Sequence, residues 1–393
     1  MPYVPEPELL QKYADILINF ALNSGDGVRA GESVLIVVPE SARQMYVPLR
    51  TSVLLAGAYP LLHFRPDNVE PGLFYGQATD AQLEWAPLEY WHGITKQFDH
   101  SVMLISHADK YELKDVDPGK LMRSQASRKP YQDMLQEKEA RGKYTWTLAL
   151  YPTEAMADDV GMTLEEYWQE VIRACYVDQP DPIGSWRTLS SELEGIRMAL
   201  NKLSIESLHV TGPDADLRIK IGTNRQWLGG SGRNIPSFEL FTSPDCRGAE
   251  GWIRFNQPLY RYGNKMDGIR LEFAAGKVVS ATASQGQELL REMIATPGAN
   301  RIGEFSLTDK RHSRIAKRMG ETLFDENIGG QYGNTHIALG NAYPEGVVGS
   351  LEDVGLNSSS IHTDIISTAP RTVVATLSDG SLQTVYSDGM FAV

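Results

Sequence analysis

The sequence predicts two domains: an N-terminal α/β domain with a mainly parallel sheet over residues 1–185, and a β-rich α+β domain over residues 186–393. The first observation behind this prediction is length, because 393 residues exceed what one ordinary hydrophobic core accommodates. The second is the alternation of helix-like and strand-like segments in the first half, which is typical of a parallel sheet. The third is a series of short strand-like segments in the second half, separated by Gly, Pro, Asn and Asp, which favours antiparallel pairing.

Helices of the first domain are predicted from apolar residues that recur at spacings of three and four. Over residues 7–23 this pattern predicts an amphipathic helix, and Gly25 follows its end because glycine is a common helix stop. Further helices are predicted over residues 40–56, 118–140 and 163–177. The segment 178–186 is predicted to connect the domains, and a helix over residues 186–203 follows it.

Strands of the first domain are predicted from short, continuous apolar runs. The segment 33–39, with its apolar run from Val34 to Val38, suits a strand that is buried on both faces of a parallel sheet. Similar runs predict strands over residues 60–64, 101–106 and 144–150. A dinucleotide site is not expected after the first strand, because Pro39-Glu40-Ser41 stands where a Gly-x-Gly-x-x-Gly motif would begin.

Strands of the second domain are shorter and are bounded by turn-forming residues. They are predicted over residues 207–210, 216–221, 251–255, 268–273 and 277–281. Two helices, over residues 285–295 and 310–322, are predicted to interrupt them. The second domain is therefore expected to be an antiparallel, β-rich structure.

The composition excludes several kinds of partner. A formal net charge of −13 argues against nucleic acid, because phosphate binding requires a basic surface. No apolar run reaches the length of about 18 residues that a membrane-spanning helix needs, so no membrane association is expected. The N-terminal segment lacks the basic and apolar regions of a secretory signal, and Cys175 and Cys246 are expected to be free thiols. These features together predict a cytoplasmic protein.

Two glutamates and two histidines of the second domain are candidate metal ligands. Glu239 and Glu304 lie between apolar neighbours, where a carboxylate must find a partner or change its pKa, although a solvent-facing position suits either one alone. His336 and His362 lie in polar segments, and an isolated histidine is more often structural than a ligand. If its segment is extended, however, His362 points to the same face as Asp364. A shared cation is the most economical partner for all of these side chains, and such a donor set, free of thiolates, suits a pair of hydrolytic ions.

These segments, together with several other motifs, resemble the M29 metallo-aminopeptidase family, of the aminopeptidase T and aminopeptidase S type. The other motifs are Trp227-Leu-Gly-Gly230, Asn234-Ile-Pro236, Asp325-Glu-Asn327, His336-Ile-Ala-Leu-Gly340 and Asn341-Ala-Tyr343. The resemblance spans essentially the whole chain and is strongest over residues 207–366. Two features depart from the family pattern: Phe238 stands where glycine is commoner, and the segment between Asn327 and His336 is longer than in the best-known members.

The resemblance implies a site of six metal ligands and one tyrosine. The implied ligands are Glu239, Glu304, Glu326, His336, His362 and Asp364. Glu304 is the carboxylate implied to touch both ions, and Tyr343 is the implied active-site tyrosine. Zinc or cobalt suits this donor set best, and manganese or iron also fits. The resemblance further implies a homodimer that acts on peptides with a free N-terminus.

The expected function is therefore that of a metal-dependent aminopeptidase, which releases N-terminal residues from peptides. Two divalent ions would share a water and lower its pKa, and Glu239 or Glu304 would handle the proton of that metal-activated water. Tyr343 would donate a hydrogen bond to the oxyanion, although the residues alone favour a packing role for this tyrosine. The sequence leaves open another dinuclear metallohydrolase, either an amidohydrolase or a phosphoesterase, and a non-enzymatic peptide-binding module.

Overall fold

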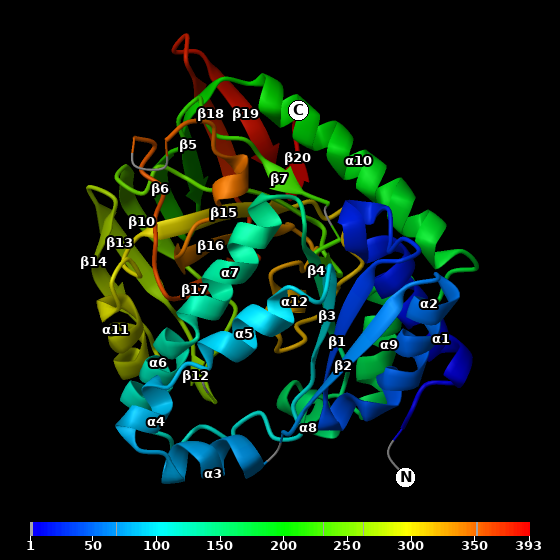
Figure 1. Cartoon of the computed structure of the whole chain (residues 1–393). Coiled ribbons are helices and arrows are strands. Elements are labelled where there is room, and N and C mark those ends of the chain that lie inside the picture. The colour runs from blue at the N-terminus through cyan, green and yellow to red at the C-terminus, as the bar shows by residue number, and fades with distance from the viewer. Residues whose placement is uncertain (1–2, 68, 231, 262, 351–352) are drawn as a thin grey trace. The chain divides into compact units, whose positions relative to one another are not determined.

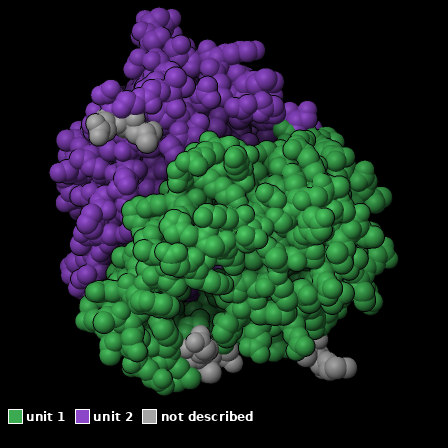
Figure 2. All heavy atoms as spheres, in the orientation of Figure 1, with its two compact units in different colours: residues 1–190, 231–237 green, residues 191–230, 238–393 purple. Residues whose placement is uncertain are grey.

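The computed structural model describes residues 3–67, 69–230, 232–261, 263–350 and 353–393. The chain forms two compact units, which Figure 2 distinguishes by colour. Unit 1 comprises residues 1–190 and the short segment 231–237, whereas unit 2 comprises residues 191–230 and 238–393. The helix α10 (Pro182–Lys202) runs from unit 1 into unit 2.

Unit 1 is built on a five-stranded sheet in which every neighbouring pair of strands is parallel. Its strands, in spatial order, are β2 (Tyr59–Arg65), β1 (Ser33–Pro39), β3 (His100–Ile105), β4 (Thr145–Leu150) and β8 (Asn234–Ile235). The predicted parallel sheet is confirmed, and the four longer strands end within one residue of the predicted segments. The two-residue strand β8 was not predicted.

Helices cover both faces of this sheet, as its apolar strands require (Figure 1). The helices of unit 1 are α1 (Pro7–Ile16), α2 (Tyr46–Leu55), α3 (Val69–Gln77), α4 (Asp80–Glu84), α5 (Leu88–Thr95), α6 (Pro118–Ser127), α7 (Lys129–Ala140), α8 (Glu154–Asp159) and α9 (Leu164–Ala174), together with the first part of α10. On one face, Leu35 of β1 packs in a buried cluster with Phe98 and Tyr144, which side chains of α5 and α7 complete. In α1, the Tyr13 hydroxyl donates a hydrogen bond of 3.0 Å to the Leu150 carbonyl of β4.

The predicted helix over residues 7–23 is helical as far as Ala21 and is wrong at residues 22–23, where the chain turns. The α-helix ends at Ile16, a π-helical turn follows, and residues 22–25 form a tight turn. Asn23 holds this turn, because its side chain donates to the carbonyl of Gly27 at 2.9 Å and its backbone N–H donates to Thr145 Oγ1 at 3.0 Å. Such bonds give the backbone an alternative to helical pairing.

Two further predicted helices are divided at prolines. The segment 118–140 forms α6 and α7, and Pro130 lies in the first turn of α7, where a missing N–H costs nothing. The segment 40–56 begins as a 3₁₀-helix (Glu40–Met45), and Pro48 lies in the first turn of α2 for the same reason.

Unit 2 contains two antiparallel sheets and a short hairpin, which confirms its predicted β-rich character. The eight-stranded sheet has the order β14 (Lys277–Thr282), β13 (Arg270–Ala274), β10 (Ala249–Arg254), β6 (Ala215–Lys220), β5 (Ile205–Gly212), β18 (Thr372–Leu377), β19 (Leu382–Ser387) and β20 (Met390–Phe391). The five-stranded sheet has the order β17 (His362–Ser367), β16 (Asn334–Gly340), β15 (Ile302–Thr308), β9 (Glu239–Thr242) and β7 (Leu228–Gly229). The hairpin pairs β11 (Leu259–Arg261) with β12 (Asn264–Met266), and the helix α11 (Gln287–Ala295) agrees with its prediction.

The predicted helix over residues 310–322 is wrong. Residues 310–312 form a turn, and the chain stays irregular until the short helix α12 (Thr322–Asp325). The cause is the buried Asp309, whose carboxylate accepts hydrogen bonds from the backbone N–H and the guanidinium of Arg311. Ser313 then donates to the carbonyl of Asn327, so side chains and not helical pairing hold this segment.

Both cysteines are buried free thiols, in agreement with the sequence prediction. Cys175 lies in unit 1, where its carbonyl accepts a hydrogen bond of 2.9 Å from the indole of Trp186. In the part of the chain that the structure describes, no helix is long and apolar enough to cross a membrane.

Candidate metal centre

The register of four neighbouring strands gathers the candidate ligands on one face of the five-stranded sheet. Ser306 of β15 pairs with Phe241 of β9 on one side and with His336 of β16 on the other. Residues that pair directly, and residues two apart along a strand, share a face. Glu239, Glu304, His336, His362 and Asp364 therefore all lie on the face that Ser306 occupies.

Small residues of β16 make room between these side chains. Ala338 lies between Glu304 and Asp364 in the pairing of β15, β16 and β17, and Gly340 pairs with His362. Gly303 precedes Glu304 at a β-bulge, where an added Cβ would lie 2.4 Å from the carbonyl oxygens of Gly340 and Asn341. Only glycine fits at that point of the strand.

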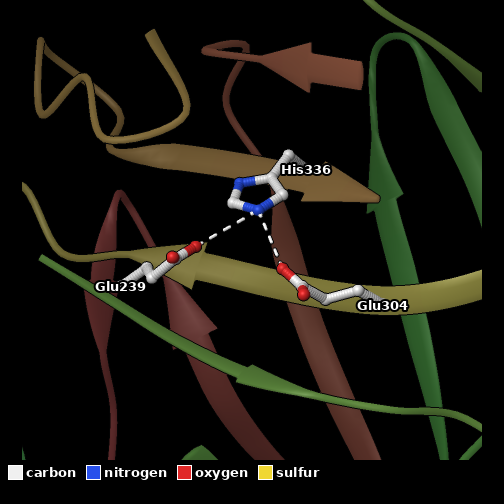
Figure 3. A group of neighbouring side chains, drawn as sticks. All are labelled: Glu239, Glu304 and His336. Atoms are coloured by element: carbon white, nitrogen blue, oxygen red, sulfur yellow. Dashed lines mark hydrogen bonds and ion pairs between the residues drawn. The ribbon is translucent and has the colours of Figure 1, made fainter. Parts of the chain in front are cut away.

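The first part of the cluster is centred on His336, which is 1% exposed. Its Nε2 lies 3.2 Å from Glu239 Oε2 and 3.2 Å from Glu304 Oε1. Figure 3 shows the ring between the two carboxylates, with one nitrogen facing both of them and the other directed away. Both glutamates are buried as well.

The second part of the cluster is centred on His362. Its Nε2 lies 3.3 Å from Asp364 Oδ1 and 3.7 Å from Glu304 Oε2, so the two oxygens of Glu304 face different histidines. On the other side of the ring, Nδ1 donates to the carbonyl of Asn341 at 2.7 Å. A histidine whose Nδ1 is held in this way directs its Nε2 toward the carboxylates, which is the usual arrangement for a metal ligand.

Glu326 joins the cluster from outside the sheet, at the end of α12. One of its oxygens, a nitrogen of His336 and an oxygen of Asp364 all lie within 4.8 Å of one another. Its neighbour Asn327 accepts a hydrogen bond of 2.7 Å from the backbone N–H of Phe238, beside Glu239. The longer segment after Asn327 therefore does not remove Glu326 from the cluster, and the six expected ligand residues lie together.

Two carboxylates of this cluster, Glu304 and Glu326, resist ionisation, because their pKa values are raised. Burial raises the pKa of Glu304. The negative charges of Glu239 and Asp364 raise it further, whereas His336 and His362 lower it. Burial also raises the pKa of Glu326 well above its ordinary value, again with contributions from Glu239 and Asp364. Several acids in so small a volume require positive charge beside them.

The histidines supply part of that charge when no metal is bound. Burial disfavours protonation of His336, but its hydrogen bonds to Glu239 and Glu304 raise its pKa well above the ordinary value. Burial also disfavours protonation of His362, but the adjacent Asp364 raises the pKa of His362 to about 9. In return, His362 lowers the pKa of Asp364 to about 2, although burial opposes this shift.

The donor set fits divalent metal ions. Glu239 Oε2, Glu304 Oε1 and His336 Nε2 converge on one point, where a divalent ion bound by all three would replace the Nε2 proton that joins them in its absence. His336 Nδ1 is buried and has no hydrogen-bond partner among the described residues. Four carboxylates and two imidazoles, without sulfur, are donors that suit zinc, cobalt, manganese or iron.

Tyr343 lies beside the second part of the cluster. Its ring contacts the imidazole of His362 edge-on, with 5.2 Å between the ring centroids, and it also contacts Phe241 at 5.6 Å. Its backbone is fixed by Ser243, whose hydroxyl lies 3.0 Å from both the N–H and the carbonyl of Tyr343. The family resemblance implied Tyr343, whereas the hydrogen bond from His362 to the carbonyl of Asn341 was not predicted, because a backbone carbonyl carries no signal in a sequence.

The fold and the site define a two-unit protein with a buried carboxylate–imidazole centre of the metal-binding type. The sequence model of the thermophilic metalloprotease family M29 matches residues 6–391. The chain therefore belongs to the M29 metalloprotease family, as the sequence resemblance predicted.

Named relatives match over nearly their full lengths. Aminopeptidase T of Thermus aquaticus is 29% identical over 95% of this chain and 96% of its own. Aminopeptidase 2 of Geobacillus stearothermophilus is 26% identical over 98% of this chain and 97% of its own. Among solved structures, AmpT of Thermus thermophilus has a TM-score of 0.84 and 24% identity, and the match covers 98% of this chain and 99% of AmpT.

A second solved structure shows that the fold alone does not decide the reaction. The 2,5-dihydroxypyridine dioxygenase of Pseudomonas putida KT2440 has a TM-score of 0.51 and 15% identity, with 99% of both chains covered. Because proteins with different activities share this architecture, function must be argued from the site and the family.

Proposed function

We propose that the protein is a metal-dependent aminopeptidase that removes N-terminal residues from peptides at a dinuclear centre. The observation that carries this proposal is the convergence of six candidate metal-ligand side chains, five on one sheet face and Glu326 at the end of α12. Membership of the M29 family supports a divalent metal and peptide-bond hydrolysis. The relatives named aminopeptidase T and aminopeptidase 2 support action at the N-terminus of peptides.

The proposed ligands divide into two overlapping sets. One ion would be held by Glu239, Glu304 and His336, and the second by Glu304, His362 and Asp364, and Glu326 would complete the site near His336. Glu304 belongs to both sets because its two oxygens face different histidines. When bound, such a pair of zinc or cobalt ions, or of manganese or iron, supplies Lewis acidity and a nucleophilic water at neutral pH.

The protein's own side chains are proposed to move protons and to stabilise charge. Glu239 or Glu304 accepts the proton of the attacking water and passes it to the leaving amine. Tyr343, whose ring lies against His362, donates a hydrogen bond to the oxygen of the scissile carbonyl as negative charge develops there. Its fixed backbone supports this role, because a preorganised donor needs no rearrangement during the reaction.

We further propose peptides with a free N-terminus as substrates, a homodimer as the assembly and the cytoplasm as the location. The division of the chain into compact units near Ser190 supports the expected domains, residues 1–185 and 186–393, with the ligands in the second. The negative net charge of the chain is complementary to the positively charged N-terminus of a peptide substrate.

The proposal is tested by comparing hydrolysis of a free leucyl peptide with hydrolysis of its N-acetylated twin. Chelator-stripped protein is assayed without metal and after addition of cobalt or zinc. We expect metal-restored cleavage of the free peptide alone, because an aminopeptidase requires the α-amine. Equal cleavage of both peptides would indicate another amide hydrolase. Cleavage of neither, with hydrolysis of a phosphoester, would replace the proposal by a phosphoesterase.

A further inference from the structure

Ser306 lies at the middle of the sheet face that carries the candidate ligands. It is two residues after Glu304 on β15, and it pairs directly with His336 on the neighbouring strand β16. Its side chain is completely buried, between neighbours that are themselves buried. A hydroxyl in that position must have a hydrogen-bond acceptor, because an unsatisfied buried polar group is costly.

The acceptor is one particular oxygen of Glu239. The Ser306 hydroxyl donates to Glu239 Oε2 at 2.7 Å, and within the described part of the chain it has no other partner. The same oxygen lies 3.2 Å from His336 Nε2. Ser306 therefore restrains the one Glu239 oxygen that faces the imidazole, and it leaves Oε1 of Glu239 outside this contact.

The position of Glu239 in its strand does not by itself fix its carboxylate beside His336. Glu239 is the first residue of β9, and in the sheet register it pairs with Thr308 and not with Ser306. Its side chain must therefore lean along the sheet to meet His336, and several rotamers compete for a flexible glutamate. A fixed donor at Ser306 selects the rotamer that places Oε2 beside His336.

We infer that Ser306 is a positioning residue of the metal centre, which holds Glu239 in the ligand geometry through its hydroxyl. The inference rests on the proposed function, because it assumes that Glu239 and His336 bind a common ion. Partners that orient metal ligands in this way typically change metal affinity by about 10–100-fold when they are removed. The strand itself does not depend on the Ser306 hydroxyl, since alanine is also accommodated in a β-strand.

The test measures cobalt binding to metal-free protein by competition with a chromophoric chelator, together with the absorption spectrum of the bound cobalt. Ser306→Ala removes the hydroxyl. Ser306→Thr and Ser306→Val form a matched pair of equal volume, of which only threonine keeps the hydrogen bond. We expect about 10–100-fold weaker binding for the alanine and valine variants and an altered cobalt spectrum, with near wild-type binding for the threonine variant.

Thr363→Val is the control for loss of a buried hydroxyl in the same sheet. Thr363 is buried on the opposite face of β17, and its hydroxyl has no hydrogen-bond partner among the described residues. This variant should bind cobalt as the wild type does. Thermal unfolding of each metal-free variant establishes that it is folded, and if the alanine variant is not, the threonine–valine pair decides.

The possible failures are distinguishable. Wild-type affinity in Ser306→Ala, or equal affinity in the threonine and valine variants, would overturn the role of Ser306 while leaving the metal centre intact. Absence of saturable cobalt binding to the wild-type protein would instead overturn the proposed function on which the inference rests.

Discussion

The replacement Gly303→Ala tests whether the backbone beside Glu304 controls the site. An alanine Cβ would lie 2.4 Å from the carbonyl oxygens of Gly340 and Asn341, whereas real contacts of this kind stay beyond 3.0 Å. The neighbouring strand must therefore move by at least 0.6 Å, from 2.4 Å to 3.0 Å. Both atoms belong to the backbone, so no flexible side chain can absorb the shift.

This shift has two expected consequences. Overpacking of a buried strand costs about 1–3 kcal/mol in the free energy of unfolding. In addition, the carbonyl of Asn341 accepts the 2.7 Å hydrogen bond that orients His362, so its displacement should turn this imidazole away from Asp364. Loss of such an orienting partner weakens metal binding by about 10–100-fold.

The assays are urea unfolding of the metal-free protein and cobalt affinity by chelator competition. Gly195→Ala is the matched control, because Gly195 lies in α10 with no atom within 4 Å of an added Cβ. It should raise the free energy of unfolding by about 0.5–1 kcal/mol, as expected for removal of a glycine from a helix. Wild-type stability together with wild-type cobalt affinity in Gly303→Ala would show that the backbone beside Glu304 does not control the site.

Three further predictions concern single side chains. Tyr343→Phe should lower turnover of a leucyl peptide by about 10²–10³-fold while sparing metal content, and unchanged turnover would remove Tyr343 from the mechanism. His336→Ala should abolish tight cobalt binding and lower the free energy of unfolding of the metal-free protein by about 3–5 kcal/mol, measured in urea, because two buried carboxylates lose their partner. Asp245 tests pH dependence: burial opposes its ionisation, but hydrogen bonds from Arg247 and Lys220 lower its pKa from 3.8 to about 2. Its contribution to stability is thus present above pH 3.8 and lost as the pH falls toward 2, so the stability difference between wild type and Asp245→Asn should shrink over this range, and a constant difference would contradict it.

Much of the fold could be predicted because strand signals in this chain are strong and local. The continuous apolar run of β1 indicated burial on both faces, and helices do cover both faces of its sheet. The wrong helix predictions have local causes, which the spacing of apolar residues does not reveal. Asp309 and Asn23 each hold a turn through side-chain hydrogen bonds, and Pro130 starts a new helix inside a periodic segment.

The residues of the candidate site could be predicted from the sequence, but their arrangement could not. Ligand types and the family resemblance identified Glu239, His336 and the other expected ligands. The register that joins them was not accessible, because β15 and β16 are buried at every residue and carry no alternation. Ser306 was missed for the same reason, since a serine inside an apolar strand indicates nothing until its pairing partner is known.

If this sheet face holds two catalytic ions, the number of zinc ions bound per chain should show it. Metal-free protein is titrated with zinc, the ions bound per chain are measured by elemental analysis, and leucyl-peptide hydrolysis is followed in the same samples. We expect two ions per chain, activity that rises with occupancy, and loss of both zinc binding and activity in His336→Ala. Full activity in metal-free protein, or zinc binding that His336→Ala leaves unchanged, would contradict it.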